Sequence, residues 1–450
     1  MSGASMRPVV GVPGVDFSIE DVRGGFPDEL EIVPLERPVD ATVQVPGSKS
    51  LTNRALLVAA LADGRSTIKN PLLSDDSYWL MDALVRLGFS VEADRAGGFA
   101  TIQGQAGIIP ESDVNLYVGN AGTVARFLPP ALALGEGPYR VDGVPRMRER
   151  PVGDLVEAMR GLGAEVEYGG EEGRFPLILV GGGLQGGVAR VKGSKSSQFL
   201  SGLLMAAPYA AGEVVLEVEG GLVSTPYVGI TVEVMSEFGI EPEVGERYGR
   251  FAVSPGSYRA RDYAIEPDAS GASYFMAAAA VLGGRVEIAG LGAGSMQGDM
   301  KFTEVLAGMG CEVQVSADRV SVRGPERLRG VEVNMNAFSD TMMTLAAIAP
   351  YAKGPTTIKN VEHTRHQETD RISAVVTELT RLGVRAEEWR DGLRIESGPV
   401  HPALVRTYGD HRMAMAFAVT GLVTPGIRIQ NPGCVTKTFP DYFHLLDSLR

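Results

Sequence analysis

The chain has 450 residues, an apolar content of 44%, a charged content of 22% and a formal net charge of −13. This length predicts two domains, and the acidic balance disfavours a general nucleic-acid-binding protein, which usually carries a basic face. No run of about 18 apolar residues indicates a membrane span, and two cysteines, Cys311 and Cys434, are too few for a disulfide scaffold, which favours a reducing cytoplasm.

Residues 1–28 contain several glycines and prolines but neither the basic start nor the apolar core of a signal peptide. We predict a loosely ordered N-terminal extension for this segment.

From residue 48 onward, a loop of small polar residues leads six times into an Ala-rich pattern. The tetrapeptide GSKS stands at both 47–50 and 193–196, so the loop recurs with the longer pattern. The pattern is apolar on nearly all sides, which predicts six buried helices. The segments are SKSLTNRALLVAALADG (48–64), GNAGTVARFLPPALALG (119–135), SKSSQFLSGLLMAAPYAAG (194–212), DASGASYFMAAAAVLGG (268–284), FSDTMMTLAAIAPYAKG (338–354) and GDHRMAMAFAVTGLVTPG (409–426).

A second marker recurs with the same period. In it, an amphipathic helical pattern ends in an apolar residue and a glycine, and a strand pattern follows. Glycine suits a helix C-terminus because it adopts a left-handed conformation without steric cost. These glycines are Gly88, Gly163, Gly239, Gly310 and Gly383. Two markers with one period predict an α/β fold of six units, each reading strand, helix, strand, helix, strand, with three units per domain.

The starts of the Ala-rich helices carry polar and charged residues, where free N–H groups and the helix dipole favour anions. Serines and carboxylates at such positions can also be ordinary caps, and we keep that alternative for Ser196, Ser197, Asp340 and Glu368. Several cations could together neutralise more than one anionic group; they are Lys49, Arg54, Arg150, Arg371, Arg412 and Lys437. Neither an HExxH zinc motif nor a GxSxG serine elbow is present, so we expect no metal and no serine hydrolase.

Taken together and in order, nine stretches resemble the 5-enolpyruvylshikimate-3-phosphate synthase family, from about residue 30 to the C-terminus. They are PGSKSLTNRALLVAAL (46–61), GNAGTVARFL (119–128), PRMRERPVG (145–153), SSQFLSGLLMAAP (196–208), STPYVGIT (224–231), DASGASYF (268–275), QETDR (367–371), YGDHRMAMAF (408–417) and KTFPDYF (437–443).

The resemblance implies a two-domain inside-out α/β barrel, with one domain formed by 29–45 and 267–450 and the other by 46–266. The chain is expected to cross between them near Val45 and Glu266. It also implies transfer of the carboxyvinyl group of phosphoenolpyruvate to the 5-hydroxyl of shikimate 3-phosphate, in the shikimate pathway and without a cofactor. A cytoplasmic monomer with these two small-molecule substrates, no nucleic acid and no membrane partner is expected, with glyphosate as an inhibitor.

Carried over residue by residue, the resemblance assigns three sets. Shikimate 3-phosphate is expected to contact Lys49, Ser50, Arg54, Ser196, Ser197, Gln198, Ser224, Tyr227, Asp340, His363 and Gln367. Phosphoenolpyruvate is expected to contact Lys49, Asn120, Gly122, Arg150, Gln198, Arg371, Arg412 and Lys437. The catalytic set is Asp340, Glu368, Lys49, His411 and Lys437, and the two carboxylates are not assigned to particular proton transfers.

Three positions depart from the family pattern. Gln367 stands where the family commonly has lysine, His363 where it has asparagine, and Phe127 where it has proline. One hypothesis is that Lys195, beside Ser196, replaces the missing cation at the phosphate, with His363 adding a donor if it is protonated. The alternative is that the Lys195 side chain points to solvent.

Two alternatives stay open. One is a UDP-N-acetylglucosamine enolpyruvyl transferase, a relative with the same fold, although residues 1–310 contain no cysteine for its usual loop residue. The other is a noncatalytic ligand-binding relative.

Overall fold

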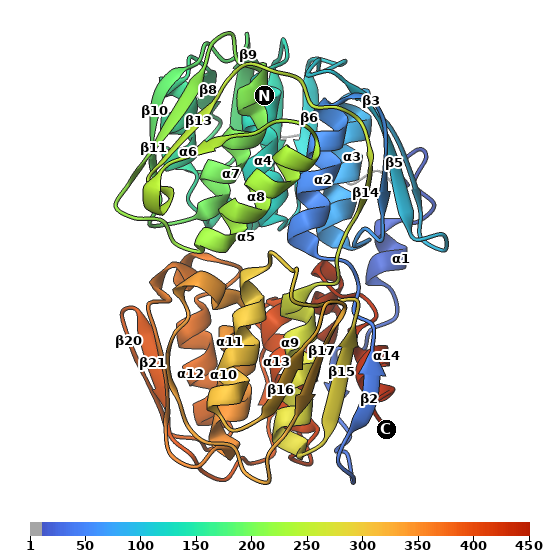
Figure 1. Cartoon of the computed structure of the whole chain (residues 1–450), viewed down its shortest axis with the longest axis vertical. Helices are drawn as coiled ribbons and strands as arrows, with labels where there is room; N and C mark the ends of the chain where they lie inside the picture. Colours follow the sequence, from blue (N-terminus) through green and yellow to red (C-terminus); the bar gives the residue numbers. More distant parts are fainter. Residues whose placement is uncertain (1–10) are drawn as a thin grey trace. The chain divides into compact units, whose positions relative to one another are not determined.

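The computed structural model describes residues 11–450, which form two compact units (Figure 1). Unit 1 contains the described residues up to Val22 together with Lys49–Ile265, and unit 2 contains Arg23–Ser48 and Glu266–Arg450. The chain passes from one unit to the other after Ser48 and again after Ile265, close to the expected crossovers near Val45 and Glu266. A third passage, after Val22, was not expected.

The N-terminal segment packs into unit 1. Residues Val12, Phe17, Ile19 and Val22 are buried in its core, and the last two belong to α1 (Ile19–Arg23). Val15 forms a parallel bridge with Ala93, and the Phe17 ring lies 5.9 Å from that of Tyr78. The prediction of a loosely ordered extension is therefore wrong for residues 11–22; residues 1–10 lie outside the described part of the chain.

Unit 1 contains three four-stranded sheets. The first is β14 (Asp262–Ala264), β3 (Asp63–Lys69), β5 (Phe99–Gln105) and β4 (Ser90–Asp94). The second is β6 (Val114–Tyr117), β7 (Tyr139–Asp142), β9 (Leu177–Gly181) and β8 (Glu165–Tyr168). The third is β10 (Gly187–Lys192), β11 (Val214–Glu219), β13 (Arg250–Val253) and β12 (Glu243–Val244).

The described part of unit 2 also contains three sheets. The first is β2 (Asp40–Val43), β15 (Arg285–Ala289), β17 (Arg319–Arg323) and β16 (Glu312–Val315). The second is β18 (Glu332–Asn334), β19 (Thr356–Lys359), β21 (Gly392–Ile395) and β20 (Ala386–Trp389). The third has three strands, β22 (Leu404–Val405), β23 (Arg428–Gln430) and β1 (Glu29–Glu31).

The sheets share one pairing pattern. In each, the first two strands named above are parallel, and every further pair is antiparallel. The four-stranded sheets therefore end in a hairpin, such as β4 with β5, where the sequence predicted a single strand. The hairpin gives the edge strand a partner and covers more of the adjacent helix.

Two strands are exchanged between the units, in the sense that each pairs in one unit although the helix that follows it in the chain belongs to the other. β2 directly precedes the first Ala-rich helix of unit 1, yet it pairs with β15 of unit 2. β14 directly precedes the first Ala-rich helix of unit 2, yet it pairs with β3 of unit 1. Consequently β2 belongs to unit 2 although the chain enters unit 1 after Ser48, and β14 belongs to unit 1 although the chain enters unit 2 after Ile265.

The six Ala-rich segments form helices whose residues are almost all buried, as predicted. They are α2 (Lys49–Leu61), α4 (Gly122–Leu132), α7 (Ser197–Ala206), α9 (Ala269–Leu282), α11 (Met342–Ile348) and α13 (His411–Gly421).

Four of the amphipathic helices lie against the sheets, whereas the one over residues 225–237 packs against α2 and α7. The five are α3 (Asp75–Arg86), α6 (Gly153–Gly161), α8 (Thr225–Glu237), α10 (Phe302–Gly308) and α12 (Arg371–Arg381), with the short α5 (Pro145–Glu149) and α14 (Tyr442–Asp447) elsewhere. The five glycines predicted to end them have φ between 81° and 102°, which confirms their left-handed conformation. Within residues 11–450 no helix has the length and apolar character needed to cross a bilayer.

Candidate functional site

The expected site residues gather at helix N-termini in both units. In unit 1 they lie at the starts of α2, α4, α7 and α8 or just after α5. In unit 2 they lie at the starts of α12 and α13 and in the 3-10 turns η4 (Asn336–Thr341), η6 (Glu362–His366) and η7 (Pro432–Lys437). Each unit thus carries its own group of expected site residues.

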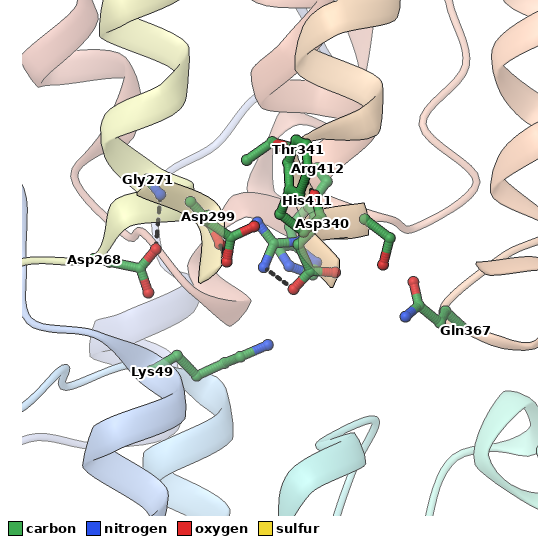
Figure 2. Close-up of polar contacts among 12 residues, drawn as sticks. Lys49, Asp268, Gly271, Asp299, Asp340, Thr341, Gln367, His411 and Arg412 are labelled. Atoms are coloured by element: carbon green, nitrogen blue, oxygen red, sulfur yellow. Dashed lines mark hydrogen bonds and ion pairs between the residues drawn. The ribbon is translucent and has the colours of Figure 1, made fainter. Parts of the chain in front are cut away.

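In unit 2, Asp340 joins two arginines. Its Oδ1 accepts from Nη1 of Arg371 at 3.0 Å, and its Oδ2 accepts from Nη2 of Arg412 at 2.6 Å. Figure 2 shows the ion pair between Asp340 and Arg412. The N-cap position of α11 is Thr341, not Asp340, so the capping interpretation of Asp340 does not hold.

Arg371 is the centre of this group of unit 2 residues and is 1% exposed. Its Nε donates to Asp410 at 2.8 Å and its Nη2 donates to Glu368 at 2.9 Å. Burial alone would lower the pKa of Arg371, but the carboxylates of Asp410, Glu368 and Asp340 outweigh burial and raise it above its ordinary value. The guanidinium is therefore a fixed charge that orients three carboxylates.

Glu368 connects this centre to Lys437, whose Nζ lies 3.7 Å from Oε1 of Glu368. It does not cap α12, because Asp370 is the N-cap and accepts from the backbone N–H of Ser373 at 3.1 Å. The side-chain oxygen of Gln367 accepts from Arg371, so this amide takes part in the arginine network.

His363 is neutral at pH 7. Burial lowers its pKa to about 4, although the nearby Asp340 opposes this shift. Its Nε2 forms a hydrogen bond with the hydroxyl of Ser339 at 2.9 Å. With this pKa, the protonation on which the expected charged donor depends is not favoured at pH 7. His411 is fully buried, with Nδ1 3.5 Å from Oδ1 of Asp410.

In unit 1, Lys49 and Ser50 are the first two residues of α2. Nζ of Lys49 lies 3.8 Å from Asp76, a carboxylate that is 1% exposed. One turn later Arg54 is buried among neutral acceptors, one of which is the backbone carbonyl of Tyr227 at 3.0 Å.

Gly122 and Arg150 are in contact. A Cβ added to Gly122 would lie 2.7 Å from Nη2 of Arg150. Gly122 is the first residue of α4, directly after Asn120 and the N-cap Ala121, and Arg150 is 6% exposed. The absence of a side chain at position 122 therefore lets the guanidinium approach this helix N-terminus, and Phe127 does not interrupt the helix.

At the start of α7, Ser196 is the N-cap and its hydroxyl accepts from the backbone N–H of Gln198 at 3.2 Å, so the capping interpretation holds for it. Ser197 is buried as the first helical residue. Lys195 does not supply a spare cation, because its Nζ lies 2.9 Å from the carboxylate of Asp154. Ser224 is the N-cap of α8 and has a left-handed conformation with φ of 51°.

Four buried acids were not among the expected site residues. Asp76, Asp154 and Asp410 pair with site or loop cations, and Asp299 accepts from the hydroxyl of Ser270 at 3.0 Å. Asp76 and Asp410 carried a weak signal, because each stands next to a buried helix start. Within residues 11–450, no group of three or more His, Cys, Asp or Glu residues is arranged to hold a metal ion.

The model of the EPSP synthase (3-phosphoshikimate 1-carboxyvinyltransferase) family matches residues 34–446. The chain belongs to the EPSP synthase family. A relative from Trichormus variabilis named 3-phosphoshikimate 1-carboxyvinyltransferase is 52% identical over 417 residues, which cover 92% of this chain and 98% of the relative. The chloroplastic enzyme of Brassica napus with the same name is 44% identical over 467 residues, covering 100% and 89% of the two chains.

Solved structures agree on the fold. EPSP synthase from Acinetobacter baumannii matches with a TM-score of 0.79 at 24% identity, covering 94% of this chain and 98% of the other. The enolpyruvyl transferase NikO from Streptomyces tendae matches with a TM-score of 0.74 at 21% identity, covering 94% and 98%. The mixed α/β fold of the EPSP synthase family is thereby shown.

Proposed function

We propose that this EPSP synthase family enzyme transfers the carboxyvinyl group of phosphoenolpyruvate to the 5-hydroxyl of shikimate 3-phosphate and releases phosphate. The single observation that carries this proposal is the arrangement around Arg371. One buried guanidinium holds Asp340 and Glu368, and each of these also meets a second cation, Arg412 or Lys437. Two carboxylates for proton transfer thus stand beside cations suited to phosphate and carboxylate groups.

The reaction requires two proton transfers in its addition step and two in its elimination step. The 5-hydroxyl oxygen bonds to C2 of phosphoenolpyruvate while its proton passes to a base, and C3 gains a proton to become a methyl group. In the resulting tetrahedral intermediate, the C–O bond to phosphate breaks as the phosphate takes up the proton lost by the hydroxyl, and the methyl group returns its proton to a carboxylate. We assign the proton transfers to Asp340 and Glu368, with Lys49, His411 and Lys437 in support.

We assign shikimate 3-phosphate chiefly to unit 1, through the starts of α2, α7 and α8. Phosphoenolpyruvate is assigned to Arg150 and the α4 start in unit 1 and to Arg371, Arg412 and Lys437 in unit 2. Asp340, His363 and Gln367 complete the shikimate 3-phosphate contacts from unit 2. In this assignment the neutral His363 contributes hydrogen bonding without charge.

The recurring sheets support an inside-out α/β barrel of six repeats, three in each unit. We further propose a cytoplasmic monomer that needs no cofactor, and inhibition by glyphosate, a phosphonate that resembles phosphoenolpyruvate.

The test is phosphate release by the purified chain. We expect turnover with phosphoenolpyruvate plus shikimate 3-phosphate and none with phosphoenolpyruvate plus UDP-N-acetylglucosamine. The opposite preference would assign the chain to the related UDP-sugar reaction, and no turnover with either acceptor would indicate a noncatalytic relative.

A further inference from the structure

Arg54 carries a buried positive charge, and the groups that accept its hydrogen bonds are all neutral. The residue is 1% exposed. Its Nε donates to the hydroxyl of Thr231 at 2.7 Å, its Nη1 to the carbonyl of Ser50 at 2.8 Å, and its Nη2 to Ser201 at 3.2 Å and to the carbonyl of Tyr227 at 3.0 Å. Within residues 11–450, its contacts include no carboxylate.

A guanidinium has five N–H groups, so these four hydrogen bonds leave one N–H on Nη1 for a further acceptor. Burial lowers the pKa of Arg54 to about 9, which shows that the protein holds this charge in a poorly solvated place. The group therefore suits an anion that arrives from outside, provided that the remaining N–H points in a fixed direction.

The ring of Phe127 lies over this guanidinium, with the Cζ atom of Arg54 4.9 Å from the ring centroid. Phe127 is fully buried. A cation over an aromatic face within about 6 Å is attracted by the ring quadrupole, and the attraction grows when both partners are removed from water. Phe127 is thus a partner to the Arg54 charge where a carboxylate would ordinarily stand.

Two contacts set the ring in this place. The side chain of Asn53 donates to the hydroxyl of Thr123 at 2.6 Å, which ties α2 to α4 one helical turn before Phe127. On α7, Gly202 lets α4 approach, because a Cβ there would lie 2.3 Å from the backbone oxygen of Arg126. Ser201, the neighbour of Gly202, accepts from Arg54, so α2, α4 and α7 converge on one guanidinium.

We propose that Phe127 is a positioning residue that holds the plane of the Arg54 guanidinium so that its remaining Nη1–H meets the carboxylate of shikimate 3-phosphate. This inference rests on the proposed function and deepens it. Phe127 acts through Arg54, and its effect is confined to ligands that carry the carboxylate. A ring that only filled the core would affect all ligands and the stability alike.

The test compares two ligands by titration calorimetry, shikimate 3-phosphate and its analogue with the carboxylate reduced to a hydroxymethyl group. Phe127→Leu removes the ring and keeps an apolar side chain. We expect about 10-fold weaker binding of shikimate 3-phosphate and less than about twofold change for the analogue. Replacement of Phe127 by 3,4,5-trifluorophenylalanine, which keeps the shape but weakens the quadrupole, should cost about threefold for shikimate 3-phosphate alone.

Phe251→Leu is the matched control, because Phe251 is equally buried in unit 1 and its recorded ring contact is with Tyr248. It should leave both affinities unchanged, and the KM for phosphoenolpyruvate should stay the same in all variants. Equal weakening of both ligands in Phe127→Leu, or no effect of the fluorinated ring, would overturn the positioning role. Failure of the unaltered enzyme to bind shikimate 3-phosphate would instead overturn the proposed function.

Discussion

Asp340 illustrates how position decides what a carboxylate does. It follows the helix-start pattern of a cap, yet it binds two arginines from α12 and α13, which only the folded chain brings together. A local pattern could therefore identify Asp340 as unusual but could not supply its partners. The same limit applies to Arg54, three of whose four acceptors come from α7 and α8, and to Lys195, whose partner Asp154 lies 41 positions earlier in the chain.

Asp340→Asn keeps the shape of the side chain and removes its charge and basicity. We expect turnover to fall by about 100-fold or more, the usual scale for loss of a general acid or base, while the affinity for shikimate 3-phosphate changes far less. Phosphate release and calorimetry measure the two quantities. Asp28→Asn, at an exposed position, is the control; near-normal turnover in Asp340→Asn would remove Asp340 from the catalytic set.

Gly122→Ala tests the contact with Arg150. The new methyl group would lie 2.7 Å from the guanidinium, so Arg150 must move away from the start of α4. We expect the KM for phosphoenolpyruvate to rise by about 10-fold, equal to about 1.4 kcal/mol, with little change in shikimate 3-phosphate affinity. Gly294→Ala is the control, since its methyl group meets open space. An unchanged KM would show that Arg150 does not bind this substrate.

His363 makes unfolding depend on pH. Its pKa is about 4 in the folded chain, below the ordinary 6.5, so the unfolded chain binds more protons between these values. The free energy of unfolding should therefore fall as the pH decreases from about 6.5 to 4, by about 3 kcal/mol in total from this group. Denaturant titrations of the unaltered chain and His363→Gln should diverge in this window. Parallel pH profiles would contradict the buried neutral histidine.

At the scale of elements, the sequence was most informative where one element carries its own signal. Six Ala-rich helices and five glycine C-termini could be recognised because burial on all sides and a left-handed residue are local properties. The hairpin strands of each sheet were missed because β16 and β17, for example, are short and half exposed. The N-terminal segment was misjudged because only a few apolar residues among many glycines and prolines enter the core.

Phe17→Ala tests whether that segment is structural. Phe17 is 4% exposed and packs against Tyr78, and truncation of a buried phenylalanine costs about 3 kcal/mol or more. We expect the free energy of unfolding of unit 1 to fall by about this amount in guanidinium titrations. Glu20→Ala, on the exposed face of α1, should have no effect. Equal stability of the two variants would show that the segment merely lies on the unit.

At the scale of the whole molecule, the exchange of β2 and β14 gives the units different autonomy. Residues 49–265 contain every strand of the unit 1 sheets, whereas residues 266–450 lack β1 and β2. No local pattern reveals which of two sheets a short strand joins. The sequence pattern therefore could not predict the exchange, and only the family resemblance implied it.

We expect a fragment of residues 49–265 to unfold cooperatively and a fragment of residues 266–450 to remain incompletely folded until residues 23–48 are added as a peptide. Circular dichroism and thermal unfolding of the fragments, with and without the peptide, measure this difference. Independent cooperative folding of residues 266–450 would mean that β1 and β2 contribute little to unit 2.

The exchanged strand also sets an order of events during synthesis. β2 leaves the ribosome early, but its partner β15 begins at Arg285, after all of the continuous part of unit 1 has been made. At about 5–20 residues per second, β2 waits on the order of tens of seconds without its native neighbour. Its length of four residues and the exposed charge of Asp40 suit this wait, because short, charged strands are poor templates for aggregation. The nascent chain thus carries an unpaired strand safely past a unit that can already fold.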